Sequence, residues 1–167
     1  MAPKKTRRAS RSEGAAKATK RAPAKRKSAA KHPHATRVLH RELARVAIAA
    51  SRQAHSPYSR IRVGAALLTD DGLVSTGANV ENASYGLTIC AERVALVKAV
   101  SEGARKFTTI AIASNTRRAL TPCGACRQSL LEFAPDLRVL LVGRRGIERE
   151  FTLAELLPAA FEPRDLR

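Results

Sequence analysis

The sequence predicts an α/β fold in which helices cover a mixed β-sheet. Between residues 37 and 161, hydrophobic residues recur in the order helix, strand, strand, helix, strand, helix, strand, completed by a short strand and a final helix. The 44% hydrophobic content supports a buried core, which must be aliphatic because only 4% of residues are aromatic. No hydrophobic run reaches the roughly 20 residues of a membrane span, so we expect a cytoplasmic protein without a membrane partner.

Residues 1–35 are predicted to form a disordered basic tail, and residues 36–167 a single folded domain. Residues 1–37 hold 13 of the 31 Lys and Arg residues against one acid, Glu13, so most of the net charge of +17 lies at this end. A segment of Ala, Lys, Arg, Ser and Pro buries too little apolar surface to offset its conformational entropy. Two interpretations stay open: a solvated tail, and a tail that binds a polyanion such as nucleic acid by counterion release.

The first predicted helix runs from Arg37 to just before Pro57. Its hydrophobic positions, at helical spacing, are Val38, Leu39, Leu43, Val46, Ala47 and Ala50. Two β-prone segments follow at residues 61–69 and 73–80. The sequence Asp-Asp-Gly between them predicts a hairpin turn.

Two further helices begin at Cys90 and Cys123, and Gly103 is expected to end the first of them. The residues predicted to face the core are Val94, Ala95, Val97 and Val100 in the first helix, and Leu130, Leu131 and Phe133 in the second. The remaining elements are strands at residues 107–114, 138–143 and 148–152, a turn at Gly146 and a closing helix at residues 153–161.

All three cysteines stand at the starts of those two helices. Cys123 and Cys126 have the two-residue separation that lets two thiolates bind one metal ion, and Cys90 can supply a third thiolate. No fourth Cys or His has a suitable spacing, since His40 and His55 lie far upstream. Three protein ligands leave a coordination position for water, as in catalytic zinc sites. A redox cysteine pair is the competing interpretation, and it gives Cys90 no role.

Glu92 follows Cys90 by two residues and is the predicted proton carrier. A carboxylate at this position can reach the open coordination position without binding the metal, take a proton from water and pass it to a nitrogen. The alternative is an acid favoured in a first helical turn by the helix dipole. Arg93 and Arg127 directly follow the cysteine motifs and are predicted to donate hydrogen bonds to the thiolates, the alternative being ordinary surface arginines.

The chain resembles the small homotetrameric zinc-dependent cytidine deaminases. The segments that carry the resemblance are PYSRIRVGAAL, NVENASYGLTICAERVALVKAVSEG, PCGACRQSLLEF and FTLAELLPAAF, spread over residues 37–165. The resemblance implies a three-layer α/β/α cytidine-deaminase-like fold with a mixed five-stranded sheet, one zinc ion per subunit, and a homotetramer with shared active sites.

The implied activity of the domain at residues 36–167 is hydrolytic deamination of cytidine and 2′-deoxycytidine to the uridine nucleosides in pyrimidine salvage. In that family, hydroxide on zinc adds to C4 and a glutamate carries protons until ammonia leaves. Glu92 matches this glutamate, and the zinc ligands match Cys90, Cys123 and Cys126.

The resemblance also assigns substrate contacts. Asn79 and Glu81 match residues that bind the ribose 3′-hydroxyl, and an amide and a carboxylate two apart at a strand end do point the same way. Tyr85 matches a residue at the subunit boundary, and Phe161 an aromatic that a neighbouring subunit contributes. By its sequence pattern alone, Phe161 would be a core residue of the last helix. Ile61 stands where the family often has a Phe against the base, which implies weaker stacking.

Three other functions compete with this one. A deaminase acting on polynucleotides agrees with the basic tail, but such enzymes usually have His in place of Cys90, and a 3′-hydroxyl clamp would obstruct a continuing strand. A blasticidin-type nucleoside deaminase should lack the clamp at Asn79 and Glu81. A non-catalytic zinc-containing nucleic-acid-binding protein leaves Glu92 without a role.

Overall fold

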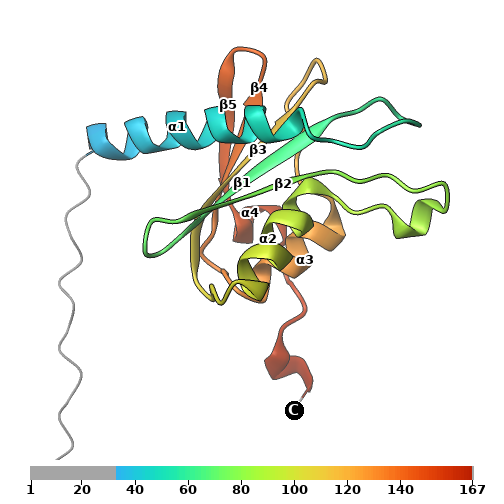
Figure 1. Cartoon of the computed structure of the whole chain (residues 1–167). Helices are drawn as coiled ribbons and strands as arrows, with labels where there is room; N and C mark the ends of the chain where they lie inside the picture. Colours follow the sequence, from blue (N-terminus) through green and yellow to red (C-terminus); the bar gives the residue numbers. More distant parts are fainter. Residues whose placement is uncertain (1–32, 167) are drawn as a thin grey trace, which may run out of the picture. The chain divides into compact units, whose positions relative to one another are not determined.

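Five strands form one mixed sheet in the computed structural model, which describes residues 33–166 (Figure 1). The strands are β1 (Val63–Thr69), β2 (Val74–Ala78), β3 (Phe107–Ser114), β4 (Arg138–Gly143) and β5 (Gly146–Thr152), in the spatial order β2-β1-β3-β4-β5. The β3–β4 pair is parallel and the other pairs are antiparallel. The predicted mixed five-stranded sheet is confirmed.

Helices lie on both faces of this sheet. They are α1 (Pro33–Ser51), α2 (Ala91–Ser101), α3 (Gly124–Leu131) and α4 (Leu153–Leu156), with short 3₁₀ helices η1 (Tyr85–Leu87) and η2 (Pro163–Leu166). The helix α1 covers one face, while α2 and α3 lie against the other (Figure 1). None of the described helices combines the length and hydrophobicity that a membrane crossing requires.

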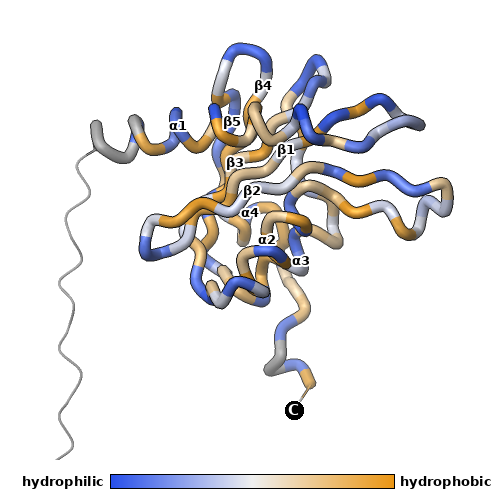
Figure 2. The backbone as a smooth tube through the Cα atoms, in the orientation of Figure 1, coloured by the Kyte–Doolittle hydropathy of each residue, from blue (hydrophilic) through white to orange (hydrophobic). Residues whose placement is uncertain are grey.

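The sheet divides the hydrophobic core into two layers because successive strand residues point to opposite faces. In β1, Ala65 and Leu67 pack on the side of α2 and α3, whereas Ala66 and Leu68 pack on the side of α1. Figure 2 shows hydrophobic residues along the central strands and hydrophilic residues in the connecting loops. Both layers are largely aliphatic, as the composition predicts.

Glycines let helix backbones approach the sheet on each face. A Cβ on Gly77 of β2 would lie 2.3 Å from the Ala91 carbonyl oxygen of α2, and one on Gly64 of β1 would lie 2.2 Å from the Ala47 carbonyl oxygen of α1. Neither position has room for a side chain. Gly77 therefore sets the distance between the sheet and the first turn of α2.

The start of α1 differs from the prediction. The helix begins at Pro33 rather than Arg37, because a proline in the first helical position loses no intrahelical hydrogen bond. The tail predicted at residues 1–35 lies, up to residue 32, outside the described residues. Leu39, expected on the buried face, is 45% exposed.

Two other predictions were wrong in detail. Val97 is 61% exposed because the buried side of α2 is formed by Ala91, Ala95, Leu96 and Ala99. Ala91 and Ala95, whose backbones approach Gly77 most closely, are small. The closing helix spans only Leu153–Leu156, and Pro158, which has no N–H to donate, follows two residues after its end. Gly103 follows α2 with positive φ, as expected.

Candidate metal centre and active site

The three cysteine sulfurs meet at the ends of two neighbouring helices. Cys90 is the N-cap residue of α2, Cys123 is the N-cap residue of α3, and Cys126 lies in the first turn of α3. The Sγ atoms of Cys90 and Cys123 are 3.8 Å apart, and those of Cys123 and Cys126 are 3.4 Å apart. All three thiols are free, and all three sulfurs lie within 4.8 Å of one another. The predicted grouping is confirmed.

The backbone leaves the sulfurs available. Cys90 and Cys123 have extended φ and ψ values, and their carbonyl oxygens accept the first hydrogen bonds of each helix, from Val94 at 3.1 Å and Arg127 at 3.0 Å. Neither cysteine caps its helix with its side chain. Both sulfurs therefore lie at helix N-termini, at the positive end of each helix dipole.

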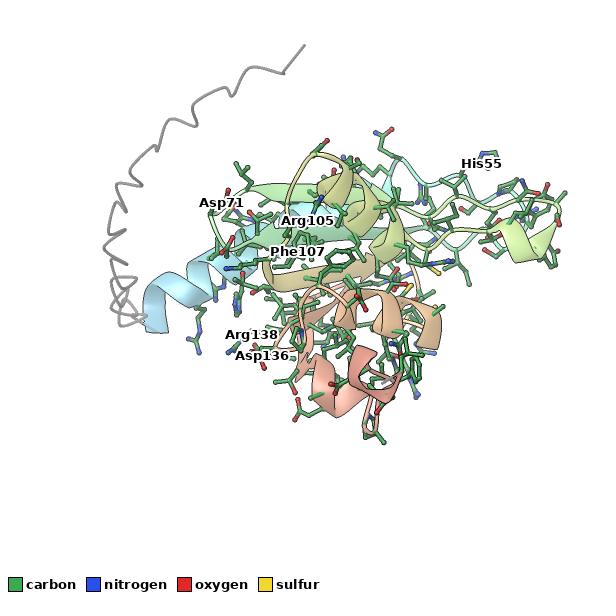
Figure 3. The ribbon with its side chains drawn as sticks, turned by 90° about the horizontal axis from the view of Figure 1, so that it is seen from below. His55, Asp71, Arg105, Phe107, Asp136 and Arg138 are labelled. Atoms are coloured by element: carbon green, nitrogen blue, oxygen red, sulfur yellow. The ribbon has the colours of Figure 1, made fainter. Side chains whose placement is uncertain are left out.

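The sulfur group fits a zinc ion. Hydrogen bonding with Cys126, supported by Cys123 and Arg93, lowers the pKa of Cys90 to about 5, and the same coupling raises the pKa of Cys126. Thiolates in this arrangement are zinc ligands. Among the side chains that the structure describes, no His, Asp or Glu joins the group, and His55 (labelled in Figure 3) lies outside it. Three ligands leave one position of a tetrahedral ion open.

Glu92 is buried beside this group. It is the second residue of α2 and is 4% exposed. Burial raises the pKa of its carboxyl to about 7, and the negative charge of Cys90 acts in the same direction. A carboxyl group with such a pKa can both accept and release a proton near neutral pH.

The two arginines that follow the cysteine motifs have different surroundings. Arg93 donates from Nη2 to the Thr88 carbonyl oxygen at 3.2 Å, and it contributes to the lowered pKa of Cys90. Arg127 instead donates to the carbonyl oxygens of Pro122 at 2.7 Å and Leu156 at 2.5 Å. These bonds tie the segment before Cys123 to the end of α4. The predicted hydrogen bond from Arg127 to a thiolate stays a prediction.

Asn79 and Glu81 follow β2 and hold the segment that precedes β1. Asn79 is buried; its Nδ2 donates to the Ile61 carbonyl oxygen at 2.9 Å, and its Oδ1 accepts from the Val63 amide at 2.7 Å. The Glu81 carboxylate accepts hydrogen bonds from the Tyr58 amide at 2.9 Å, and from the Ser59 amide and hydroxyl. Bonding to Ser59 lowers the pKa of Glu81, so its oxygens stay charged acceptors.

A cavity of about 370 Å³ lies at Glu81. Its other lining residues are Tyr58, Ser59, Tyr85 and Thr88. The rings of Tyr58 and Tyr85 meet edge to face with centroids 5.9 Å apart. Tyr58 and Ser59 were not among the predicted site residues, because neither hydrophobic periodicity nor metal-ligand spacing distinguishes a loop residue.

Ile61 and Phe161 are both at the surface, 38% and 58% exposed. Phe161 lies beyond α4, so its assignment by pattern alone to the core of the last helix was wrong. Its carbonyl oxygen accepts a hydrogen bond from Gln128 of α3 at 2.8 Å, which fixes this backbone segment against the second cysteine helix.

Comparisons with known proteins point to one family. Residues 37–142 match the family model described as the cytidine and deoxycytidylate deaminase zinc-binding region. The cytidine deaminase of Halalkalibacterium halodurans is 54% identical over 125 residues, which cover 74% of this chain and 95% of that protein. A probable cytidine deaminase of Dictyostelium discoideum is 53% identical over 114 residues, 68% of this chain and 77% of that protein. The crystal structure of the cytidine deaminase from Burkholderia pseudomallei aligns with a TM-score of 0.70 and 48% identity, over 73% of this chain and 98% of that one.

Proposed function

The chain belongs to the cytidine and deoxycytidylate deaminase family, and on this premise we propose that it hydrolyses the 4-amino group of free cytidine and 2′-deoxycytidine, releasing ammonia. The observation that carries the proposal is the buried Glu92 beside three thiols whose sulfurs lie within 4.8 Å of one another. A metal site that only stabilises the fold does not require a buried carboxyl whose pKa is raised to about 7.

Cys90, Cys123 and Cys126 would hold the zinc ion. Bound zinc supplies Lewis acidity and lowers the pKa of water. The thiols must lose their protons to bind the metal, and Arg93 helps to lower the pKa of Cys90. Arg93 thereby offsets part of the negative charge that three thiolates bring to one dication.

Glu92 moves the protons. Deamination requires a proton to be taken from water and delivered to the pyrimidine ring and to the departing amine. The Glu92 carboxyl, with a pKa near 7, suits both steps at neutral pH. Its position in the first turn of α2 fixes it relative to Cys90, because both belong to one rigid backbone segment.

Glu81 is the proposed acceptor for a ribose hydroxyl, since its charged oxygens line the cavity beside Tyr85. Asn79 stays a predicted sugar contact. Its hydrogen bonds to the backbone of Ile61 and Val63 position the segment that carries Ile61, the residue expected to contact the pyrimidine base. Exposed Phe161 and Tyr85 suit contacts with a second subunit, as a homotetramer with shared active sites requires. We further propose a cytoplasmic location and polyanion binding by residues 1–35.

Ammonia release tests the proposed function. Wild-type protein and a Cys123→Ser variant would be given cytidine, 2′-deoxycytidine and an oligonucleotide with internal cytosines. We expect turnover of both free nucleosides and little of the oligonucleotide, with zinc content and turnover both falling in Cys123→Ser. Faster reaction with the oligonucleotide would favour a polynucleotide deaminase, and no ammonia from any substrate would overturn the proposal.

A further inference from the structure

A basic groove lies between α1 and the β4–β5 hairpin. Its cavity has a volume of about 840 Å³, and five arginines line it against a single carboxylate, Glu150. We call the site formed by Arg37, Arg41, Arg45, Arg138 and Arg145 the basic groove. Figure 3 labels Arg138, and Figure 2 shows the hydrophilic tip of the β4–β5 hairpin.

Carboxylates pair with two of the five arginines in the groove. The Glu150 carboxylate is held by Arg138 and lies 3.9 Å from His40, and Arg45 pairs with Glu42 at 2.8 Å. Among the described residues, Arg37, Arg41 and Arg145 have no ion-pair partner. Exposed guanidinium groups that have no ion-pair partner are suited to phosphate, which they bind with two parallel hydrogen bonds.

The spacing of the arginines favours a chain of phosphates over a single one. Arg37, Arg41 and Arg45 stand at four-residue intervals along one side of α1, so their Cα atoms extend over about 12 Å. Phosphates of one nucleic-acid strand recur about every 3.4 Å of helix axis, so the stripe can follow several of them. Ile48 and Ile147 also line the groove, and they offer apolar contact to the sugars.

The groove is separate from the cysteine site. The helix α1 packs on the face of the sheet opposite to α2 and α3, whose N-termini carry the cysteines (Figure 1). The highly basic residues 1–32 also join the chain directly before α1. A polyanion bound along α1 can therefore leave the active site open.

We propose that the basic groove binds the sugar-phosphate backbone of a nucleic acid. Binding is independent of sequence, because arginine contacts to phosphates carry no base information. This inference does not rest on the proposed deaminase activity.

The test is binding of the full-length protein to fluorescent single-stranded RNA and duplex DNA, followed by anisotropy at several salt concentrations. The groove variant is Arg41→Gln with Arg145→Gln. The matched control is Arg52→Gln with Arg144→Gln, which removes the same charge at two exposed positions outside the groove, just after α1 and in the β4–β5 turn. Melting temperatures and cytidine turnover of both variants should match those of the wild type.

For duplex DNA, log K falls as log salt rises, and we expect this slope to be less steep by about 1.8 in the groove variant, because each lost phosphate contact contributes about 0.9. The control should change the slope by much less. Equal changes in both variants, or none in either, would overturn the proposal by assigning binding to overall charge or to the N-terminal segment. Displacement of the oligonucleotide from wild type, but not from the groove variant, by micromolar inorganic tripolyphosphate would also overturn it, in favour of a small-anion site.

Discussion

Gly77→Ala should disturb the active site through the backbone of α2. The added Cβ would lie 2.3 Å from the Ala91 carbonyl oxygen and 2.5 Å from the Ala95 nitrogen, whereas ordinary contacts begin at 3.4 Å. Both obstacles are backbone atoms, so α2 must move away by about 1 Å. Overpacking of this kind costs about 1–3 kcal/mol of unfolding free energy. A displacement of about 1 Å of catalytic groups lowers turnover about 100-fold.

Gly64→Ala is the matched control, because its Cβ would meet α1 on the opposite face, 2.2 Å from the Ala47 carbonyl oxygen. The assay combines urea unfolding, zinc content and kcat/KM for cytidine. Both variants should lose similar stability, and only Gly77→Ala should lose zinc retention and turnover. Wild-type turnover in Gly77→Ala, or an equal loss in Gly64→Ala, would refute the argument that Gly77 sets the position of Cys90 and Glu92.

Three further changes have defined expectations. Thr152→Ala removes the hydroxyl that accepts a hydrogen bond from the Glu155 amide to cap α4, while the Thr152 amide still donates to the Glu155 carboxylate. Urea unfolding should show a loss of about 1 kcal/mol, and an unchanged midpoint would contradict this. Arg127→Ala removes the hydrogen bonds to the carbonyl oxygens of Pro122 and Leu156. We expect the unfolding free energy to fall by about 1–3 kcal/mol and zinc to transfer faster to a chelator. Unaltered zinc transfer would disprove the positioning role. In zinc-free protein, the pKa of the Glu92 carboxyl is 4.5 in the unfolded chain and is raised to about 7 in the folded chain. Between these pH values the folded state binds more protons than the unfolded state, so the free energy of unfolding falls as the pH rises. Zinc-free Glu92→Gln has no carboxyl at this position, so its unfolding free energy should not fall in this way. Relative to wild type, the variant should become more stable by up to about 3 kcal/mol as the pH rises from about 5 to about 8. Parallel pH profiles of the two proteins would refute the raised pKa.

The sheet and its helices were predictable where hydrophobic spacing is regular. The segments at residues 61–69 and 107–114 coincide closely with β1 and β3, since both are bounded by polar residues. The exposure of Val97 was not predictable, because helical spacing alone does not say which of two apolar sides of α2 meets the sheet. The buried side is fixed by the approach of α2 to Gly77, a contact between segments distant in sequence.

The three-cysteine metal group was predictable because the separation of its ligands in the sequence is typical of a metal site. Cys123 and Cys126 lie within one turn at the start of α3, and Cys90, like Cys123, is the N-cap residue of its helix. The role of Arg127 depends on where α4 brings the Leu156 carbonyl oxygen, which no local pattern contains. The contact of Tyr58 with Tyr85 likewise joins two loops that only the folded chain brings together.

The most direct test of the account is the turnover of cytidine by zinc-loaded Glu92→Gln. Glutamine preserves the size of the buried side chain but cannot exchange a proton, and the three cysteines are untouched. We expect zinc occupancy equal to that of the wild type and turnover lower by at least about 100-fold, the usual contribution of a positioned acid–base group. Turnover within a few-fold of the wild type at full zinc occupancy would contradict the assignment of Glu92 as the proton carrier.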